Sequence, residues 1–200
     1  EEFITGDTLA FLLEKGFLPE VEAADIICQL CDALTVLHQA GIVHRDIKPE
    51  NLILRGSELV LIDFDVSRIS NPSHNNDTRI MGTTGYAAPE QYGFSQTDAR
   101  ADLYAAGVTF NEMLIGQHPS RALAAGPFRP VIERCIEVNV DKRYQTAAEL
   151  RAAVLRRLHY RKRRRLWLTV AGVSAAAILA LGIFAASRPR PVQGETAPSV

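Results

Sequence analysis

The polar segment from His44 to Asn51 constrains the fold of this chain more than any other stretch. A regular helix cannot pass through Pro49, because the proline ring removes a helical hydrogen bond and clashes with the preceding turn. Apolar residues at helical spacing precede the segment, and two short apolar runs follow it. We therefore expect a loop between a helix and a hairpin, on which a carboxylate (Asp46), an ammonium (Lys48) and a carboxamide (Asn51) converge.

Seventeen residues beyond Asp46, at the end of the predicted hairpin, stands the sequence Asp63-Phe64-Asp65. Two carboxylates and an amide around one hairpin can hold Mg²⁺, which prefers oxygen ligands and keeps phosphate oxygens in its shell. A further carboxylate can accept the proton of an attacking hydroxyl. These groups suit phosphoryl transfer, in which positioning and charge neutralisation supply most of the catalysis.

Apolar periodicity and turn residues predict the elements around this loop. Apolar side chains from Val21 to Leu37 recur at helical spacing, and Gly41 ends that helix. Residues 65–97 are rich in Ser, Asn, Thr, Gly and Pro, which predicts a long loop that is either functional or disordered. The other predicted elements are an extended entry at 1–5, a turn at Gly6-Asp7, a short helix ending at Gly16, the start of the long helix at Pro19, a β-bridge at 42–43, a hairpin of residues 51–54 and 59–62, and helices at 99–115, 131–138 and 146–158.

Five sequence motifs follow one another along the chain. HRDIKPEN resembles the kinase catalytic loop, and LIDFD resembles the metal-binding motif that follows it. MGTTGYAAPEQYG (81–93) resembles the end of the activation segment, 102–107 the start of the central buried helix, and DKRYQTAAEL (141–150) the last helix. The resemblance covers about 150 residues, and the most similar subfamily is that of the bacterial membrane-anchored serine/threonine kinases.

This resemblance implies a fold and a reaction. The fold is mainly α (α+β), a kinase C-terminal lobe with small β-hairpins, followed by one transmembrane helix. The reaction is transfer of the γ-phosphate of ATP to Ser and Thr of protein substrates. Asp46 would be the general base and Lys48 would steady the γ-phosphate, while Asn51 and Asp63 would ligate Mg²⁺. A lysine at position 48 favours Ser/Thr over Tyr as the acceptor.

The resemblance also assigns roles in the activation segment. Thr83 would contact Asp46 and Lys48 across the segment that faces the substrate. Arg45 precedes the base, as in kinases whose activation loop is ordered by phosphorylation, because an arginine fork binds phosphate through two hydrogen bonds. A purely structural arginine is the alternative. Ser70, Ser73 and Thr78 are the candidate phosphosites.

Four further residues receive structural roles from the resemblance. Glu90 would pair with Arg143, and Asp102 opens the central helix. His44 is interpreted as a packing and hydrogen-bonding residue rather than a ligand.

The first residues, Glu1 to Asp7, resemble the kinase hinge. The backbone at Glu2 and Ile4 would then hydrogen-bond adenine, and Ile53 would lie beneath the adenine ring. The alternative is that these are ordinary edge residues.

The sequence departs from the family at three places. These 200 residues contain no Gly-rich phosphate loop, no V-A-x-K lysine and no αC glutamate, so we expect a chain that begins at the hinge of a longer parent and is inactive alone. Asp65 stands where the family has Gly, which adopts positive φ at lower cost. Residues 120–127 are a short connection after the central helix, which predicts a reduced docking face there.

Two other functions compete with a kinase. The missing motifs and Asp65 would suit a membrane-tethered pseudokinase or scaffold without catalysis. An aminoglycoside-type phosphotransferase has a similar fold, but Ala88-Pro89-Glu90 and the Asp102 helix disfavour it.

Charge divides the chain into two parts. Residues 1–150 carry 12 Lys and Arg against 22 Asp and Glu, whereas residues 151–200 carry 10 against one. The uncharged stretch 166–186 is long enough to cross a bilayer, at about 1.5 Å per residue. Because basic residues gather on its N-terminal side, the positive-inside rule places the preceding residues in the cytoplasm. The alternative is a buried globular helix.

The predicted organisation is a partial kinase domain at 1–155, a basic juxtamembrane segment at 156–165, the transmembrane helix at 166–186 and an extracytoplasmic tail at 187–200. The partners predicted are protein substrates and membrane lipid, bound by 166–186 and its basic flank. Nucleic acid is not expected, because no base-reading motif accompanies the basic residues. A homodimer is left open.

Cys28 and Cys31 form a C-x-x-C pattern, which in other contexts indicates redox or zinc chemistry. They lie inside a long amphipathic segment, and no second pair completes a metal site. We interpret them, together with Cys135, as core residues without disulfides, as in a reducing compartment.

Overall fold

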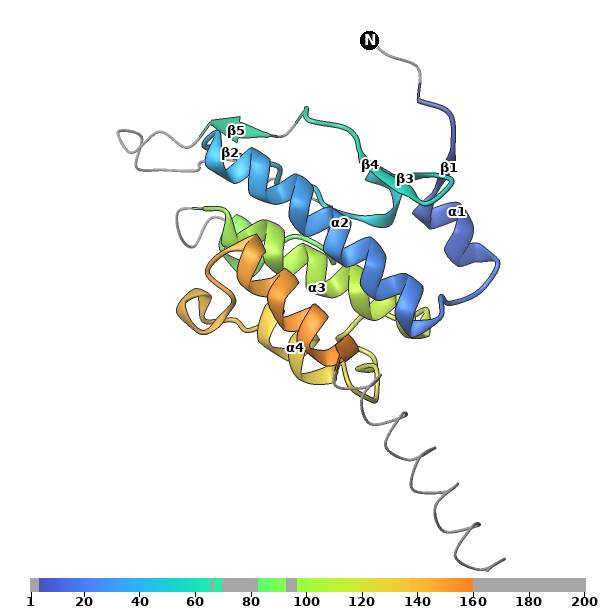
Figure 1. Ribbon diagram of the computed structural model, residues 1–200. Coiled ribbons are helices and arrows are strands. Elements are labelled where there is room, and N and C mark those ends of the chain that lie inside the picture. Colours follow the sequence, from blue (N-terminus) through green and yellow to red (C-terminus); the bar gives the residue numbers. More distant parts are fainter. Residues whose placement is uncertain (1–3, 66, 70–82, 93–96, 160–200) are drawn as a thin grey trace, which may run out of the picture. The chain divides into compact units, whose positions relative to one another are not determined.

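The computed structural model describes residues 4–65, 67–69, 83–92 and 97–159 (Figure 1). The helices are α1 (Leu9–Glu14), α2 (Glu20–Gln39), α3 (Arg100–Ile115), α4 (Arg129–Cys135) and an unlabelled last helix over residues 147–159. The strands are β1 (Asp7–Thr8), β2 (Ile42–Val43), β3 (Leu52–Arg55), β4 (Glu58–Leu61) and β5 (Arg68–Ile69). Short 3-10 turns cover Pro49–Asn51, Pro89–Tyr92 and Val140–Lys142.

Helix α3 is the centre of the core and is buried on most faces. Helices α2 and α4 pack against it (Figure 1), and the rings of Phe110 and Phe128 meet at 5.0 Å. Gly116 ends α3 in the left-handed conformation, where glycine has no Cβ penalty. The helix predicted over 99–115 is therefore confirmed to within one residue.

Gly107 allows α3 and α4 to approach closely. A Cβ atom added to it would lie 2.3 Å from Cβ of Cys135. Real side chains do not approach so closely, so the spacing of the two helices requires glycine at this position.

Helix α2 begins one residue later than predicted, because Pro19 is its N-cap residue. Val21 was predicted to lie on the buried face, but it is 54% exposed. The buried stripe instead starts at Ala23 and runs along the helix to Leu34. Val21 lies in the first turn of the helix and faces solvent.

The two small sheets draw together segments distant in the sequence. Strands β1, β3 and β4 form an antiparallel sheet in that order, and β2 pairs with β5. The predicted hairpin is confirmed with a two-residue turn, since Arg55 faces Glu58 and Gly56 has a φ of 65°. The backbone bends at Gly6, as predicted for Gly6-Asp7, but Asp7 already belongs to β1. Strand β5 likewise lies within the stretch predicted as a loop over 65–97.

The last third of the described chain differs slightly from expectation. Helix α4 covers Arg129–Cys135 instead of 131–138, and the final helix covers residues 147–159.

All three cysteines are free and buried, as interpreted from the sequence. Burial raises the pKa of Cys28 to about 11 and that of Cys135 to about 12, which makes them unreactive as thiolates.

Several predictions fall outside the described residues. They concern Glu2, the phosphosites Ser70, Ser73 and Thr78, and the proposed membrane span at 166–186. Within the part of the chain that is described, no helix is both long and apolar enough for a bilayer.

Candidate active site

Asp102 on α3 holds the start of the loop that carries the candidate catalytic residues. Its carboxylate accepts the backbone N–H groups of His44 at 2.9 Å and Arg45 at 2.7 Å. It also lies 2.8 Å from Nε2 of His38, near the end of α2. Asp102 is fully buried, so these partners offset the cost of burying its charge.

The loop adopts a conformation that few non-glycine residues accept. Arg45 has a φ of 69° and Asp63, which follows β4, has a φ of 64°. Such conformations are strained and persist only where surrounding contacts fix them. For Arg45 those contacts include Asp102 and Gln91, whose side chain donates to the Arg45 carbonyl at 2.9 Å.

Asp46, Lys48 and Thr83 form a triangle of short contacts. Lys48 Nζ lies 2.7 Å from Asp46 Oδ2 and donates to Thr83 Oγ1 at 2.7 Å. The Thr83 hydroxyl in turn donates to Asp46 Oδ1 at 2.7 Å, and the Thr83 backbone N–H donates to the same oxygen at 3.2 Å. These are the contacts that the kinase resemblance implied for Thr83. The catalytic roles themselves stay predictions.

The surroundings keep Asp46 ionised. Burial alone would raise the pKa of its carboxyl, but hydrogen bonds from Lys48, Thr83 and Asn51, with the positive charge of Lys48, lower it below the usual value. A carboxylate that remains charged can accept a hydrogen bond from a substrate hydroxyl.

Asn51 and Asp63 lie at the same end of the β3–β4 hairpin. The backbone N–H of Ile62 donates to the Asn51 carbonyl at 3.0 Å, which places Asp63 next to the start of β3. The Asn51 amide nitrogen donates to the Asp46 carbonyl at 2.8 Å and to Asp46 Oδ2 at 3.0 Å. This orientation directs the amide nitrogen to Asp46 and leaves the Oδ1 atom as the end able to ligate a cation.

The residues at this end of the hairpin fit Mg²⁺. Asn51 offers an amide oxygen and Asp63 an exposed carboxylate, the oxygen ligands that Mg²⁺ uses alongside water and phosphate. Among the described residues, no group of three or more His, Cys, Asp or Glu side chains could hold a metal. Asn51 and Asp63 would supply two of the oxygen ligands of such a cation, and water and phosphate oxygens would complete its shell.

His44 is buried and not placed to ligate a metal. Its Nε2 lies 3.1 Å from the Ile62 carbonyl, and its Nδ1 accepts the Asp46 N–H at 3.4 Å. Its ring meets that of Phe64 edge to face at 4.9 Å. The residue thus links the catalytic loop to the start of the Asp63 motif, consistent with its interpretation as a packing and hydrogen-bonding residue.

Glu90 and Arg143 form a bidentate ion pair inside the protein. The two guanidinium nitrogens donate to the two carboxylate oxygens at 2.7 and 2.8 Å. Arg143 is fully buried, and Glu90 is 5% exposed. The pair joins the turn at Pro89–Tyr92 to the chain just before the last helix.

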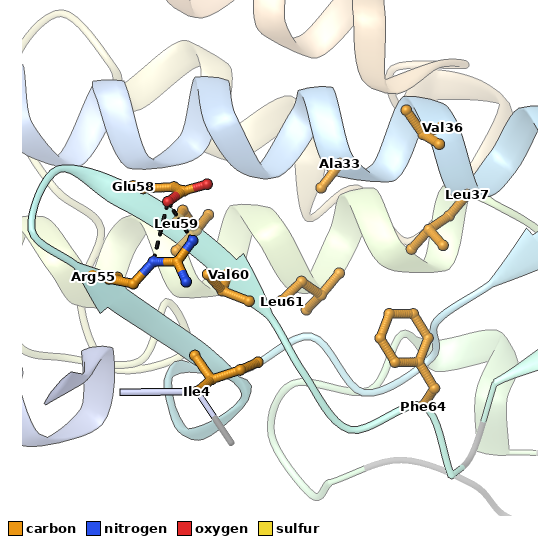
Figure 2. A pocket seen from close by; sticks show the side chains of 10 residues that line it. All are labelled: Ile4, Ala33, Val36, Leu37, Arg55, Glu58, Leu59, Val60, Leu61 and Phe64. Carbon is orange, nitrogen blue, oxygen red and sulfur yellow. Dashed lines mark hydrogen bonds and ion pairs between the residues drawn. The ribbon is translucent and has the colours of Figure 1, made fainter. Parts of the chain in front are cut away.

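A cavity of about 450 Å³ lies between α2 and the β3–β4 hairpin (Figure 2). Figure 2 shows Ala33, Val36 and Leu37 of α2 along one side, with Ile4 and Phe64 also in its lining. Ile53 is 8% exposed and does not line this cavity. Ile4 and Ile53, both predicted to contact adenine, are therefore not brought together around this cavity.

Sequence reasoning missed two residues of the site. Gln91 accepts the Ala88 N–H and donates to Arg45, which ties the Ala-Pro-Glu turn to the catalytic loop. His38 contacts Asp102 from α2. A polar side chain on the buried stripe of an amphipathic helix is the signal that could have identified His38.

The fold and this site define a class of protein. Residues 1–171 match the model of the protein kinase domain. The chain belongs to the protein kinase family.

The individual relatives are bacterial serine/threonine kinases. The chain is 31% identical over 182 positions to serine/threonine-protein kinase PknB of Mycobacterium leprae, an alignment that covers 78% of this chain and 29% of that protein. It is 31% identical over 183 positions to PknB of Mycobacterium tuberculosis (strain ATCC 25618 / H37Rv), with the same coverage. It is 30% identical over 186 positions to serine/threonine-protein kinase pkn2 of Myxococcus xanthus, covering 76% of this chain and 22% of that protein. The chain thus spans less than a third of the length of these relatives.

Proposed function

We propose that the protein carrying this chain is a serine/threonine protein kinase that transfers the γ-phosphate of ATP to hydroxyl groups of other proteins. The observation that carries the proposal is the contact triangle of Asp46, Lys48 and Thr83. Family membership and similarity to serine/threonine kinases support the same reaction.

Each residue of the triangle has a task in this reaction. The Asp46 carboxylate orients the substrate hydroxyl and accepts its proton. The Lys48 ammonium lies 2.7 Å from Asp46, so it can stabilise the negative charge of the transferred phosphoryl group close to the attacking oxygen. Thr83 brings the segment that faces the substrate to these two residues. Asn51 and Asp63 would hold Mg²⁺, which neutralises phosphate charge when bound.

The test is Mg²⁺-dependent labelling of the whole protein with γ-labelled ATP. Asp46→Asn keeps the size of the side chain but removes the base, so labelling is expected to fall by about 10²-fold or more. Asp25→Asn is the matched control, because Asp25 is exposed and accepts a hydrogen bond from its helical neighbour Gln29 at 2.9 Å. Undiminished labelling by the Asp46 variant would refute its role as the base. A wild-type protein that binds partners but never labels would establish the pseudokinase or scaffold function instead.

Regulation by phosphorylation is part of the proposal. Arg45, next to the base, would receive a phosphate carried by Ser70, Ser73 or Thr78. Mass spectrometry of the autophosphorylated protein would identify the modified residue. Replacing that residue by Ala is expected to reduce activity, and unchanged activity would leave Arg45 with a purely structural role.

We also propose that the kinase is anchored in a membrane with residues 1–165 in the cytoplasm. The uncharged stretch 166–186 and the basic run 161–165 before it support this arrangement. Extraction at alkaline pH should leave the whole protein in the membrane fraction, and deletion of 166–186 should release it. Release of the intact protein by alkali would overturn the proposal. A homodimer of the anchored kinase stays a prediction.

A further inference from the structure

His118 follows α3 and contacts the segment that faces the substrate. Its Nε2 lies 2.7 Å from the carbonyl oxygen of Gly85, 33 residues earlier in the chain. Its Nδ1 lies 2.7 Å from the hydroxyl of Ser120 and accepts the Ser120 backbone N–H at 3.1 Å. The ring is half-buried between these two partners.

The partners determine which ring nitrogen carries the proton. A carbonyl oxygen can only accept, so Nε2 must donate to Gly85. A backbone N–H can only donate, so Nδ1 must accept from Ser120. The neutral ring protonated at Nε2 is thus the form that satisfies both contacts. It is a rigid connector with one donor and one acceptor at fixed positions.

Gly85 belongs to the same turn as Thr83. The N–H groups of Tyr86 and Ala87 both donate to the Thr83 carbonyl at 3.1 Å, and the Thr83 side chain contacts Asp46 and Lys48. The Tyr86 hydroxyl donates to Glu112 of α3 at 2.5 Å. One end of this turn is therefore fixed to the proposed catalytic residues, and its other end is fixed to α3 and to His118.

Gly85 depends on this attachment more than its neighbours do. It has a φ of 100°, and a Cβ atom added to it would meet nothing nearer than the His118 ring, at 3.8 Å. Glycine samples many conformations when unrestrained. The hydrogen bond from His118 acts on the residue of the turn whose backbone has most freedom to move.

We propose that His118 is a positioning residue for protein substrates, because its Nε2–H fixes the Gly85 carbonyl and so the turn along which a substrate lies. The inference rests on the proposed kinase function. Since the ring contacts the substrate side of the site and not Asn51 or Asp63, its loss should weaken binding of protein substrate and leave binding of ATP unchanged.

Two substitutions separate this role from simple support of the 118–120 loop. In His118→Gln, the amide nitrogen takes the place of Nε2 and can donate to Gly85. In His118→Asn, the amide oxygen takes the place of Nδ1 and can accept from Ser120, but nothing reaches Gly85. The Gln variant therefore keeps the contact to the substrate segment, and the Asn variant keeps only the contact within the loop.

The experiment measures kcat and both KM values of the whole protein with Mg-ATP and myelin basic protein. A basic acceptor is chosen because residues 1–150 carry an excess of acidic side chains. His118→Ala and His118→Asn are expected to raise KM for the protein acceptor about threefold to tenfold, the factor that corresponds to one net hydrogen bond. KM for ATP should change by less than about twofold in the same comparison. His118→Gln should restore the KM for the acceptor, and His159→Gln, at an exposed position, is the matched control.

The outcomes separate the inference from its premises. Rescue by Asn and not by Gln, or an unchanged KM for the acceptor in the Ala variant, would overturn the role of His118. Thermal unfolding midpoints of the four variants identify any loss caused by misfolding. Fluorescence anisotropy with labelled myelin basic protein ranks the same variants without turnover. If the wild-type protein transfers no phosphate, the kinase proposal fails, while the anisotropy ranking still decides whether His118 positions the turn.

Discussion

The carboxylate of Asp102, on the buried helix α3, accepts a hydrogen bond of 2.7 Å from the backbone N–H of Arg45. Arg45 directly precedes the proposed base and has a φ of 69°. The strained backbone next to Asp46 is thus held by a charge in the protein core. The position of the proposed base depends on α3, which lies 57 residues further along the chain.

Asp102→Asn should uncouple the loop from the core. The amide has one oxygen and one NH₂ group, so a donor would face one of the two backbone N–H groups that Asp102 now accepts. We expect a loss of about 1–3 kcal/mol in the free energy of unfolding, and a fall in kcat of about 10²-fold because the base is displaced. Urea denaturation followed by circular dichroism and the labelling assay measure the two effects. Asp32→Asn is the control, since Asp32 is exposed and pairs with Arg151 at the surface; equal effects of both changes would contradict the role of Asp102.

The buried ion pair of Glu90 and Arg143 predicts that replacing one partner lowers the free energy of unfolding more than replacing both. Arg143→Met would leave Glu90 buried without its partner, and breaking a buried pair from one side costs about 3–5 kcal/mol. Replacing both residues with Gln and Met should cost less than the single change, because no uncompensated charge remains. Denaturant unfolding of the two single variants and the double variant measures the coupling. Additive effects would show that the pair contributes no interaction of its own.

Gly107→Ala should separate α3 from α4. The added methyl group would sit 2.3 Å from Cβ of Cys135, and overpacking of this kind costs about 1–3 kcal/mol. The better helix propensity of alanine, about 1 kcal/mol, offsets only part of that cost.

A second substitution tests whether the clash is the cause. Cys135→Gly removes the atom that Gly107→Ala would meet, so the double variant should lose less stability than the sum of the two single variants. A coupling energy of zero in this double-mutant cycle would show that the helices adjust without strain.

The lowered pKa of Asp46 predicts a pH dependence of stability. The unfolded carboxyl takes up its proton at about pH 4, whereas the folded one stays charged to lower pH. Its contribution is fully present above about pH 4 and is lost as the pH falls through the folded pKa. The unfolding free energy of Asp46→Asn should therefore decline less steeply below pH 4 than that of the wild type. Asp98, whose pKa is lowered mainly by Arg100 against the effect of burial, contributes in both proteins and cancels in the comparison. Identical slopes would contradict the lowered pKa.

The elements that depend on neighbours along the chain could be predicted from the amino-acid sequence. The periodic apolar residues of α2 and α3, the Gly56 turn between β3 and β4, and the order of the kinase motifs were all legible there, because helices and tight turns are specified over a few residues. The burial of Cys28 and Cys31 followed from the same periodicity.

Features that depend on distant segments became apparent only in the folded protein. Strands β1 and β5 are two residues long and exist because β3 and β2 supply their hydrogen bonds. The contacts of Asp102 with the catalytic loop and of His118 with Gly85 cross 57 and 33 residues. No local pattern encodes such contacts, because they arise when the packing of α3 brings polar groups together and burial then requires each of them to find a partner.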